Sequence, residues 1–174
     1  WLDIYVRNAG NVKGDDQKNE LFINNHDLTF TESAEEYNLA DSGFTTHTAF
    51  FDYDGDGDLD AYILNNSFIP VNSLGYVNKR ELRGEDWDLP EIFKGGGDKL
   101  MRNDNGKFVD VSEEAGIYGS LIGFGLGVSV GDVNADLLPD IYVSNDFYEH
   151  DYLYINNGDG TFKEDIKNRM SHLS

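Results

Sequence analysis

Residues 52–63 read Asp52-Tyr53-Asp54-Gly55-Asp56-Gly57-Asp58-Leu59-Asp60-Ala61-Tyr62-Ile63, an acidic loop that continues directly into an apolar strand. Aspartates occupy loop positions 1, 3, 5, 7 and 9, and a glycine at position 6 permits a sharp turn. An EF-hand would need a bidentate glutamate at position 12, followed by a helix, but that position is Ile63. The segment therefore predicts a metal-binding turn between two β-strands.

The predicted ligands in this loop are all oxygen atoms. Clustered carboxylates repel one another until a cation lies among them. A flexible loop with many oxygen ligands suits Ca²⁺ better than Mg²⁺, and Zn²⁺ would favour histidine or cysteine. We expect the side chains of Asp52, Asp54, Asp56 and Asp60 to bind Ca²⁺, together with the backbone carbonyl of Asp58.

A second loop, at residues 132–140, repeats the pattern with fewer charges. Its expected ligands are Asp132, Asn134, Asp136, Asp140 and the backbone carbonyl of Leu138. Leu137 stands where the first loop has its glycine, and positive φ at a bulky residue costs about 1 kcal/mol or more. We therefore expect a weaker site here. Asp3 has the ninth position of a third such loop, whose first six residues the sequence lacks, so no site is expected there.

Three imperfect repeats organise the chain. Each repeat has a strand of the type Asp-x-Tyr, beginning at Asp3, Asp60 or Asp140, and then a hairpin that ends in Thr-Phe or Lys-Phe. The sequence predicts a partial unit over 1–40, a unit over 41–119 with a long insertion at 68–98, and a C-terminally incomplete unit over 120–174. Functional residues are often found on long ordered loops, although a variable surface excursion is the simpler reading of the insertion.

The local sequence pattern predicts an all-β chain. Strands of four to seven residues alternate with breaks rich in Gly, Asn and Asp, and the hairpins at Asn105-Gly106 and Asp159-Gly160 carry strong turn signals. Only Glu32–Tyr37 and Val111–Ala115 are expected to hold a helical turn. Four antiparallel strands per unit, repeated radially, are typical of a β-propeller, which needs at least four such blades to close. We therefore expect a piece of a larger propeller.

Composition excludes several classes of partner. The formal charge of −20 argues against nucleic acid and anionic membranes, which both attract basic surfaces. No apolar stretch approaches the ~20 residues of a membrane span, and the absence of cysteine excludes disulfides and thiolate sites. The chain opens on a strand without an initiator Met or a signal peptide, so its start carries no information about secretion.

These motifs together resemble the FG-GAP, or VCBS, repeat, and are most similar to bacterial proteins in which such repeats accompany an ASPIC/UnbV region, as in cartilage acidic protein. The resemblance rests on the acidic loops, on the Asp-Ile-Tyr-Val strands and on residues 123–134, 144–149 and 154–162. It implies integrin-α-like blades of a seven-bladed propeller, whose calcium ions fasten the loops on one rim. It also implies a secreted or cell-surface protein that binds proteins or glycans.

The first functional hypothesis is therefore a calcium-stabilised binding module that is not an enzyme. The insertion offers the best candidate contact surface, because aromatic residues and arginine are enriched at binding hot spots. Its candidate ligand-binding residues are Tyr76, Arg80, Arg83, Trp87 and Phe93.

Two alternatives remain open. One is an assembly subunit that joins the remainder of its propeller, or a complex partner, through exposed strand edges. The other is a calcium-dependent polysaccharide lyase or hydrolase. His26, His47, His150 and His172 show no recognisable catalytic spacing, although Glu149 and His150 lie together in a polar turn.

Overall fold

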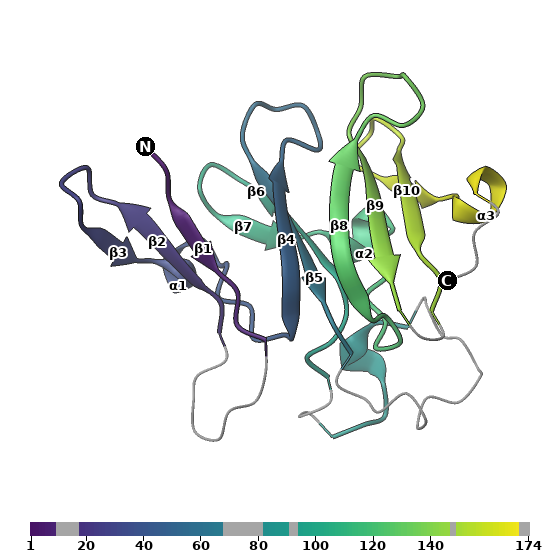
Figure 1. The fold of residues 1–174 in the computed structure, drawn as a ribbon, viewed down its shortest axis with the longest axis horizontal. Coiled ribbons are helices and arrows are strands. Elements are labelled where there is room, and N and C mark those ends of the chain that lie inside the picture. Colours follow the sequence, from purple (N-terminus) through teal and green to yellow (C-terminus); the bar gives the residue numbers. More distant parts are fainter. Residues whose placement is uncertain (10–17, 68–81, 91–93, 147–148, 171–174) are drawn as a thin grey trace.

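The computed structural model describes residues 1–9, 18–67, 82–90, 94–146 and 149–170, and these residues form three antiparallel sheets (Figure 1). The first sheet holds β1 (Ile4–Val6), β2 (Glu20–Asn24) and β3 (Phe30–Glu32) in that order. The predicted all-β class is confirmed, with three sheets placed side by side in the described part of the chain.

The second and third sheets have four strands each. The second holds β4 (Thr45–Phe51), β5 (Asp60–Asn65), β6 (Lys99–Asn103) and β7 (Phe108–Asp110). The third holds β8 (Gly125–Gly131), β9 (Asp140–Asn145), β10 (Tyr152–Asn156) and β11 (Phe162–Glu164). Both follow chain order, so every neighbouring pair consists of consecutive antiparallel strands.

Short helices follow the last strand of each sheet. These are α1 (Ala34–Tyr37), α2 (Ser112–Ala115) and α3 (Ile166–Arg169), and a 3₁₀ turn, η2, spans Gly84–Asp86. The sequence analysis expected helical turns only at the first two places, which was wrong for α3. Ile166 repeats the contact of Ala34, because each donates its N–H to a glutamate two residues earlier, so aligning the repeats would have predicted α3.

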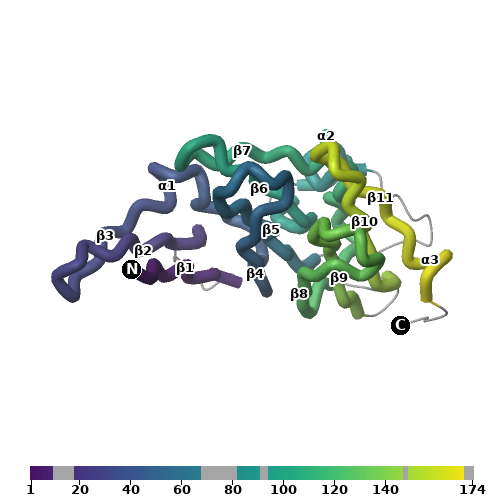
Figure 2. The backbone as a smooth tube through the Cα atoms, turned by 90° about the horizontal axis from the view of Figure 1, so that it is seen from above, coloured from purple at the N-terminus to yellow at the C-terminus, as the bar shows by residue number. Residues whose placement is uncertain are grey.

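The sheets pack face to face through two apolar clusters. Leu21, Leu39, Ala61, Ile63 and Met101 join the first sheet to the second. A larger cluster joins the second sheet to the third, and its members are Phe51, Tyr53, Tyr62, Leu64, Leu100, Val111, Ala115, Ile117, Val128, Ile141, Val143, Tyr152, Tyr154 and Phe162. Figure 2 shows β4 and β8 on one side of this array and β7 and α2 on the opposite side.

β4 and β8 lie directly against each other. The Thr46 hydroxyl donates to the Gly125 carbonyl at 2.8 Å, and the Val128 N–H donates to His47 Nδ1 at 3.1 Å. The loops that follow these two strands carry the acidic sequences, and both lie at the top edge of Figure 1. The described residues include no helix that is both long and apolar enough to cross a membrane.

Candidate metal centre

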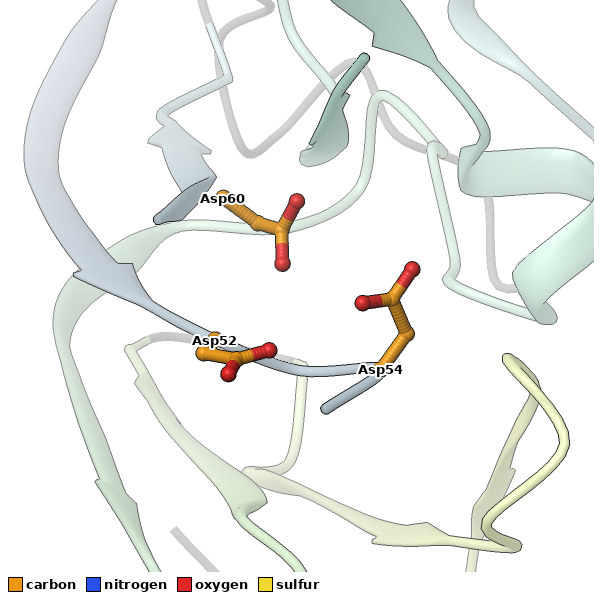
Figure 3. A group of neighbouring side chains, drawn as sticks. All are labelled: Asp52, Asp54 and Asp60. Atoms are coloured by element: carbon orange, nitrogen blue, oxygen red, sulfur yellow. The ribbon is translucent and has the colours of Figure 1, made fainter. Parts of the chain in front are cut away.

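Three aspartates converge where β4 passes into β5. Asp52 directly follows β4, Asp60 opens β5, and Asp54 lies in the loop between them. Each offers a carboxylate oxygen, and these oxygens lie within 4.8 Å of one another. Figure 3 shows the three carboxylates turned toward a shared space. Of the residues that the structure describes, these form the one group of acidic or histidine side chains that could hold a metal ion in this way.

The loop backbone is organised by Asp52. Its carboxylate accepts the N–H groups of Gly55 at 2.8 Å and Gly57 at 3.0 Å. Gly57, at loop position 6, has a φ of 96°, a value that residues with a side chain rarely adopt. The sharp turn predicted from the glycine is therefore present.

Asp60 fastens the site to the sheet. Its side chain accepts the Tyr53 N–H at 3.0 Å and the Asn103 N–H at 2.8 Å. Burial raises the pKa of Asp60 to about 6; the two hydrogen bonds offset part of this effect, while Asp54 and Asp58 add to it by charge repulsion. A cation beside these groups would reverse the repulsion and favour the ionised carboxylates.

The other two aspartates of the predicted loop, Asp56 and Asp58, differ in how far their side chains are buried. Asp56 is exposed and its Oδ1 accepts the Asp58 N–H at 3.0 Å. Asp58 Oδ1 is buried and has no hydrogen-bond partner within the described chain, and burial raises the pKa of this carboxyl. A buried acceptor without a donor costs free energy, and a hard cation would satisfy it. The donor set therefore fits a metal ion that prefers oxygen.

The second loop has the same backbone path but a different arrangement of side chains. Asp132 accepts N–H groups from residues 134–137, and these bonds lower its pKa. The Asn134 amide donates to Asp136 Oδ2 at 2.7 Å. Asp140 repeats the anchoring role of Asp60, since it accepts the N–H groups of Val133 and Asn156. Leu138, whose carbonyl was the predicted fifth ligand, donates its N–H to Asp136 Oδ1 at 2.9 Å.

Leu137 stands in the strained position that the sequence predicts. Its φ is 72° and 90% of its surface is exposed, so the side chain gains little from packing. Replacing Leu137 by glycine should raise the free energy of unfolding by about 0.5–1 kcal/mol, because relief of the strain exceeds the added freedom of the unfolded chain. Urea unfolding measures this change. Val133→Gly is the matched control, with an exposed side chain at ordinary φ, and it should be destabilising; a loss in both variants would contradict the strain.

The candidate ligand-binding residues of the insertion are only partly within the described chain. Tyr76, Arg80 and Phe93 lie outside it. Arg83 has a side chain that is 13% exposed, and it lies against Gly119, where an added Cβ would come within 2.7 Å of the guanidinium carbon. Trp87 is half-buried and donates its indole N–H to the Leu82 carbonyl at 3.1 Å. These two side chains thus contact the chain's own backbone.

The histidines lie at separate places. His47 accepts a hydrogen bond from β8, His26 stacks on Trp1, and His150 Nδ1 is 3.4 Å from a carboxylate oxygen of the buried Glu149. His172 lies outside the described residues. No histidine belongs to the group formed by Asp52, Asp54 and Asp60.

The sequence analysis missed a polar network at the opposite end of the same strands. Asp98 accepts the Tyr62 hydroxyl at 2.8 Å and the Asn65 N–H at 3.1 Å. In the third sheet, Asp151 accepts from Tyr142 and Asn145 in the same way. In the first sheet, the corresponding residues are Asn19, Tyr5 and Asn8. The signal was present in the repeats, since each acidic or amide residue stands two positions before the leucine of its strand.

Two comparisons bear on the identity of the fold. Residues 1–63 match the family model of the FG-GAP-like repeat, a segment that includes the strand at Asp3 and the whole loop from Asp52 to Asp60. This match supports the predicted FG-GAP repeat over that part of the chain. No curated protein matches the sequence.

Proposed function

We propose that this chain is a calcium-binding FG-GAP repeat module within a β-propeller that works outside the cell or at its surface. The observation that carries the proposal is the convergence of Asp52, Asp54 and Asp60, with the buried and unpartnered Asp58 Oδ1 in the same loop. Oxygen donors on one loop favour Ca²⁺ over Mg²⁺, which demands a near-ideal octahedron and keeps several waters.

The metal would have a structural role. Asp52 and Asp60 already hold the loop backbone through three hydrogen bonds, and Asp60 accepts a fourth from Asn103 of β6. A cation among them would fix the geometry of the loop. The surfaces that such loops frame would then bind a protein or glycan. We propose no catalytic role for these residues. We also propose that the chain is most similar to the FG-GAP proteins that have an ASPIC/UnbV region.

The propeller is supported by the arrangement of the sheets. Sheets of the same strand order pack face to face, and their first strands, β4 and β8, lie together on one side of the array (Figure 2). Radial repetition of four-stranded sheets is the propeller plan. The −20 net charge agrees with a setting in which calcium is plentiful.

Thermal unfolding in EDTA and across a Ca²⁺ titration, with Mg²⁺ in parallel, tests the proposal. One site at about 100 times its dissociation constant adds about 2.7 kcal/mol to the free energy of unfolding. We expect a rise that Ca²⁺ produces and an equal concentration of Mg²⁺ does not. Asp54→Ala should remove the rise, since Asp54 is exposed and contributes to the cluster through its carboxylate.

The control is Glu113→Gln, which removes one charge from the exposed surface of α2. It should keep the full calcium response. Equal loss in both variants would mean that calcium acts through the net charge of the chain and not through the loop. The proposal would be overturned if the wild type is folded and its melting temperature does not change with Ca²⁺.

A further inference from the structure

A small cavity lies at the rim opposite the acidic loops. It has a volume of about 120 Å³ and is bounded by the start of β6, the segment before β4 and the turn η2. Arg83, Lys94 and Lys99 line it, so three of the chain's 13 basic side chains surround one space. In a chain with a net charge of −20, such a concentration of cations favours the binding of a negative group.

The Arg83 guanidinium in this cavity is mostly buried but has few close partners. Its side chain is 13% exposed, and within the described chain its two polar contacts are both 3.5 Å long, from Nε to Glu85 Oε1 and from Nη1 to the Ile117 carbonyl oxygen. The charge of the buried Asp98 also acts on Arg83, although Asp98 takes its hydrogen bonds from other residues. A guanidinium has five N–H donors, and a shielded donor without a close acceptor costs free energy. An oxyanion in the cavity would supply acceptors for this group.

Backbone donors line the same cavity. Residues 95–97 are all glycine, and among the described residues none of their three N–H groups donates a hydrogen bond, although Gly97 is buried. Gly97 has a φ of 102°, and an added Cβ there would lie 2.3 Å from the Gly119 carbonyl oxygen, so only glycine fits this position. Successive backbone N–H groups of this kind form concave anion-binding sites.

The acidic side chains of the lining limit the charge that the cavity can accept. Asp41 pairs with Lys99, and Glu85 is the distant partner of Arg83. Lys94 Nζ donates to the backbone carbonyl of Glu85 at 3.0 Å. The lining thus has three positive and two negative side chains, an excess of one positive charge. The Glu85 side chain is 72% exposed, so an anion could replace it beside the guanidinium while Glu85 turns into solvent.

We propose that this cavity binds a small oxyanion group with one negative charge, a carboxylate or a sulfate ester. The planar fork of Arg83 pairs with two of its oxygens, Lys94 adds a point charge, and the N–H groups of residues 95–97 donate to the anion. The cavity is smaller than the roughly 300–1,000 Å³ of pockets that hold a drug-sized ligand, so it holds a single charged substituent. The proposal goes beyond the calcium site, which lies at the opposite ends of the same strands, and does not rest on it.

Titration of the ¹⁵N-labelled chain with sodium acetate and with sodium methyl sulfate tests the site. The buffer is freed of calcium with a chelating resin, so failure of the calcium proposal cannot affect the result, and sodium chloride keeps the ionic strength constant. We expect saturable shifts of the amide resonances of residues 95–97, with a dissociation constant in the millimolar range. The probe that binds more tightly identifies the carboxylate or the sulfate ester as the preferred group.

Matched variants locate the binding site. Arg83→Gln removes the guanidinium and should weaken binding by about tenfold or more. Arg102→Gln removes the same group at the other end of β6, outside the cavity, and should change binding by less than about twofold. Lys94→Gln should weaken binding by about threefold. Circular dichroism checks that each variant folds; should Arg83→Gln not fold, the comparison of Lys94→Gln with Arg102→Gln decides.

Three results would overturn the proposal. The first is the absence of saturable shifts with either probe. The second is a set of shifts confined to residues outside the cavity. The third is equal weakening by the cavity variants and by Arg102→Gln, which would mean that anions respond to the net charge of the chain and not to this site.

Discussion

Replacing Asp60 by alanine is expected to lower the free energy of unfolding by about 4 kcal/mol in saturating calcium. Two causes add. The N–H groups of Tyr53 and Asn103 lose their acceptor, which costs about 1–3 kcal/mol for a buried group, and the loop loses a metal ligand and with it about 2.7 kcal/mol of linked binding energy. Removal of a desolvated carboxylate offsets part of this loss.

Urea unfolding in EDTA and in Ca²⁺ separates the two causes. In EDTA, Asp60→Ala should still be less stable than wild type, because the hydrogen bonds do not involve metal. Asp54→Ala is the matched comparison: it should lose the calcium response while remaining close to wild type in EDTA. If the two variants behave alike under both conditions, Asp60 does not have the anchoring role that its contacts indicate.

Replacing Asp98 by asparagine is expected to stabilise the chain at alkaline pH, by up to about 4 kcal/mol. Burial raises the pKa of Asp98 from 3.8 to about 7, with Tyr62, Asn65 and Arg83 partly opposing the change. Because the pKa of Asp98 is higher in the folded state than in the unfolded state, the protonated acid contributes fully to the free energy of unfolding below about pH 4. This contribution is lost as the pH rises toward about 7. Asparagine fits this position, as Asn19 shows in the first sheet.

The measurement is the difference in unfolding free energy between Asp98→Asn and wild type from about pH 4 to pH 8, in EDTA throughout. The difference should be small at the acid end and grow through about pH 7, since only the wild type must ionise a buried group. Titration of Asp60 occurs in both proteins and cancels. A difference that stays constant over this range would contradict the buried, raised pKa of Asp98.

Much of the fold was predictable because the repeats keep their turn chemistry. Gly57 and Asp52 define the loop locally, so the positions of β4 and β5 followed from a few residues. The convergence of Asp52, Asp54 and Asp60 was equally predictable, because all three belong to one short loop. The burial of Asp58 Oδ1 was not predictable, since alternation along a loop does not determine which carboxylate the rest of the fold covers.

Other features depend on contacts between distant residues. Asp98 becomes a buried hydrogen-bond acceptor only because β5 and β6 bring it against Tyr62 and Asn65. Arg83 was a candidate for ligand binding by residue type, but its position against Gly119 depends on a segment more than thirty residues away in sequence. Composition and periodicity do not contain that information.

The paired anchors at the two ends of the central strands have a consequence for how this chain could change in evolution. Asp60 fastens β5 to the end of β6 at one rim, and Asp98 fastens it at the other. The connection between them spans residues 66–98, whereas the equivalent connection in the third sheet spans only 146–151, yet Ala61 faces Met101 just as Ile141 faces Tyr154. Strand alignment is thus independent of the length of this connection, so the rim that carries Asp98 can gain or exchange whole segments while the sheets beneath stay unchanged.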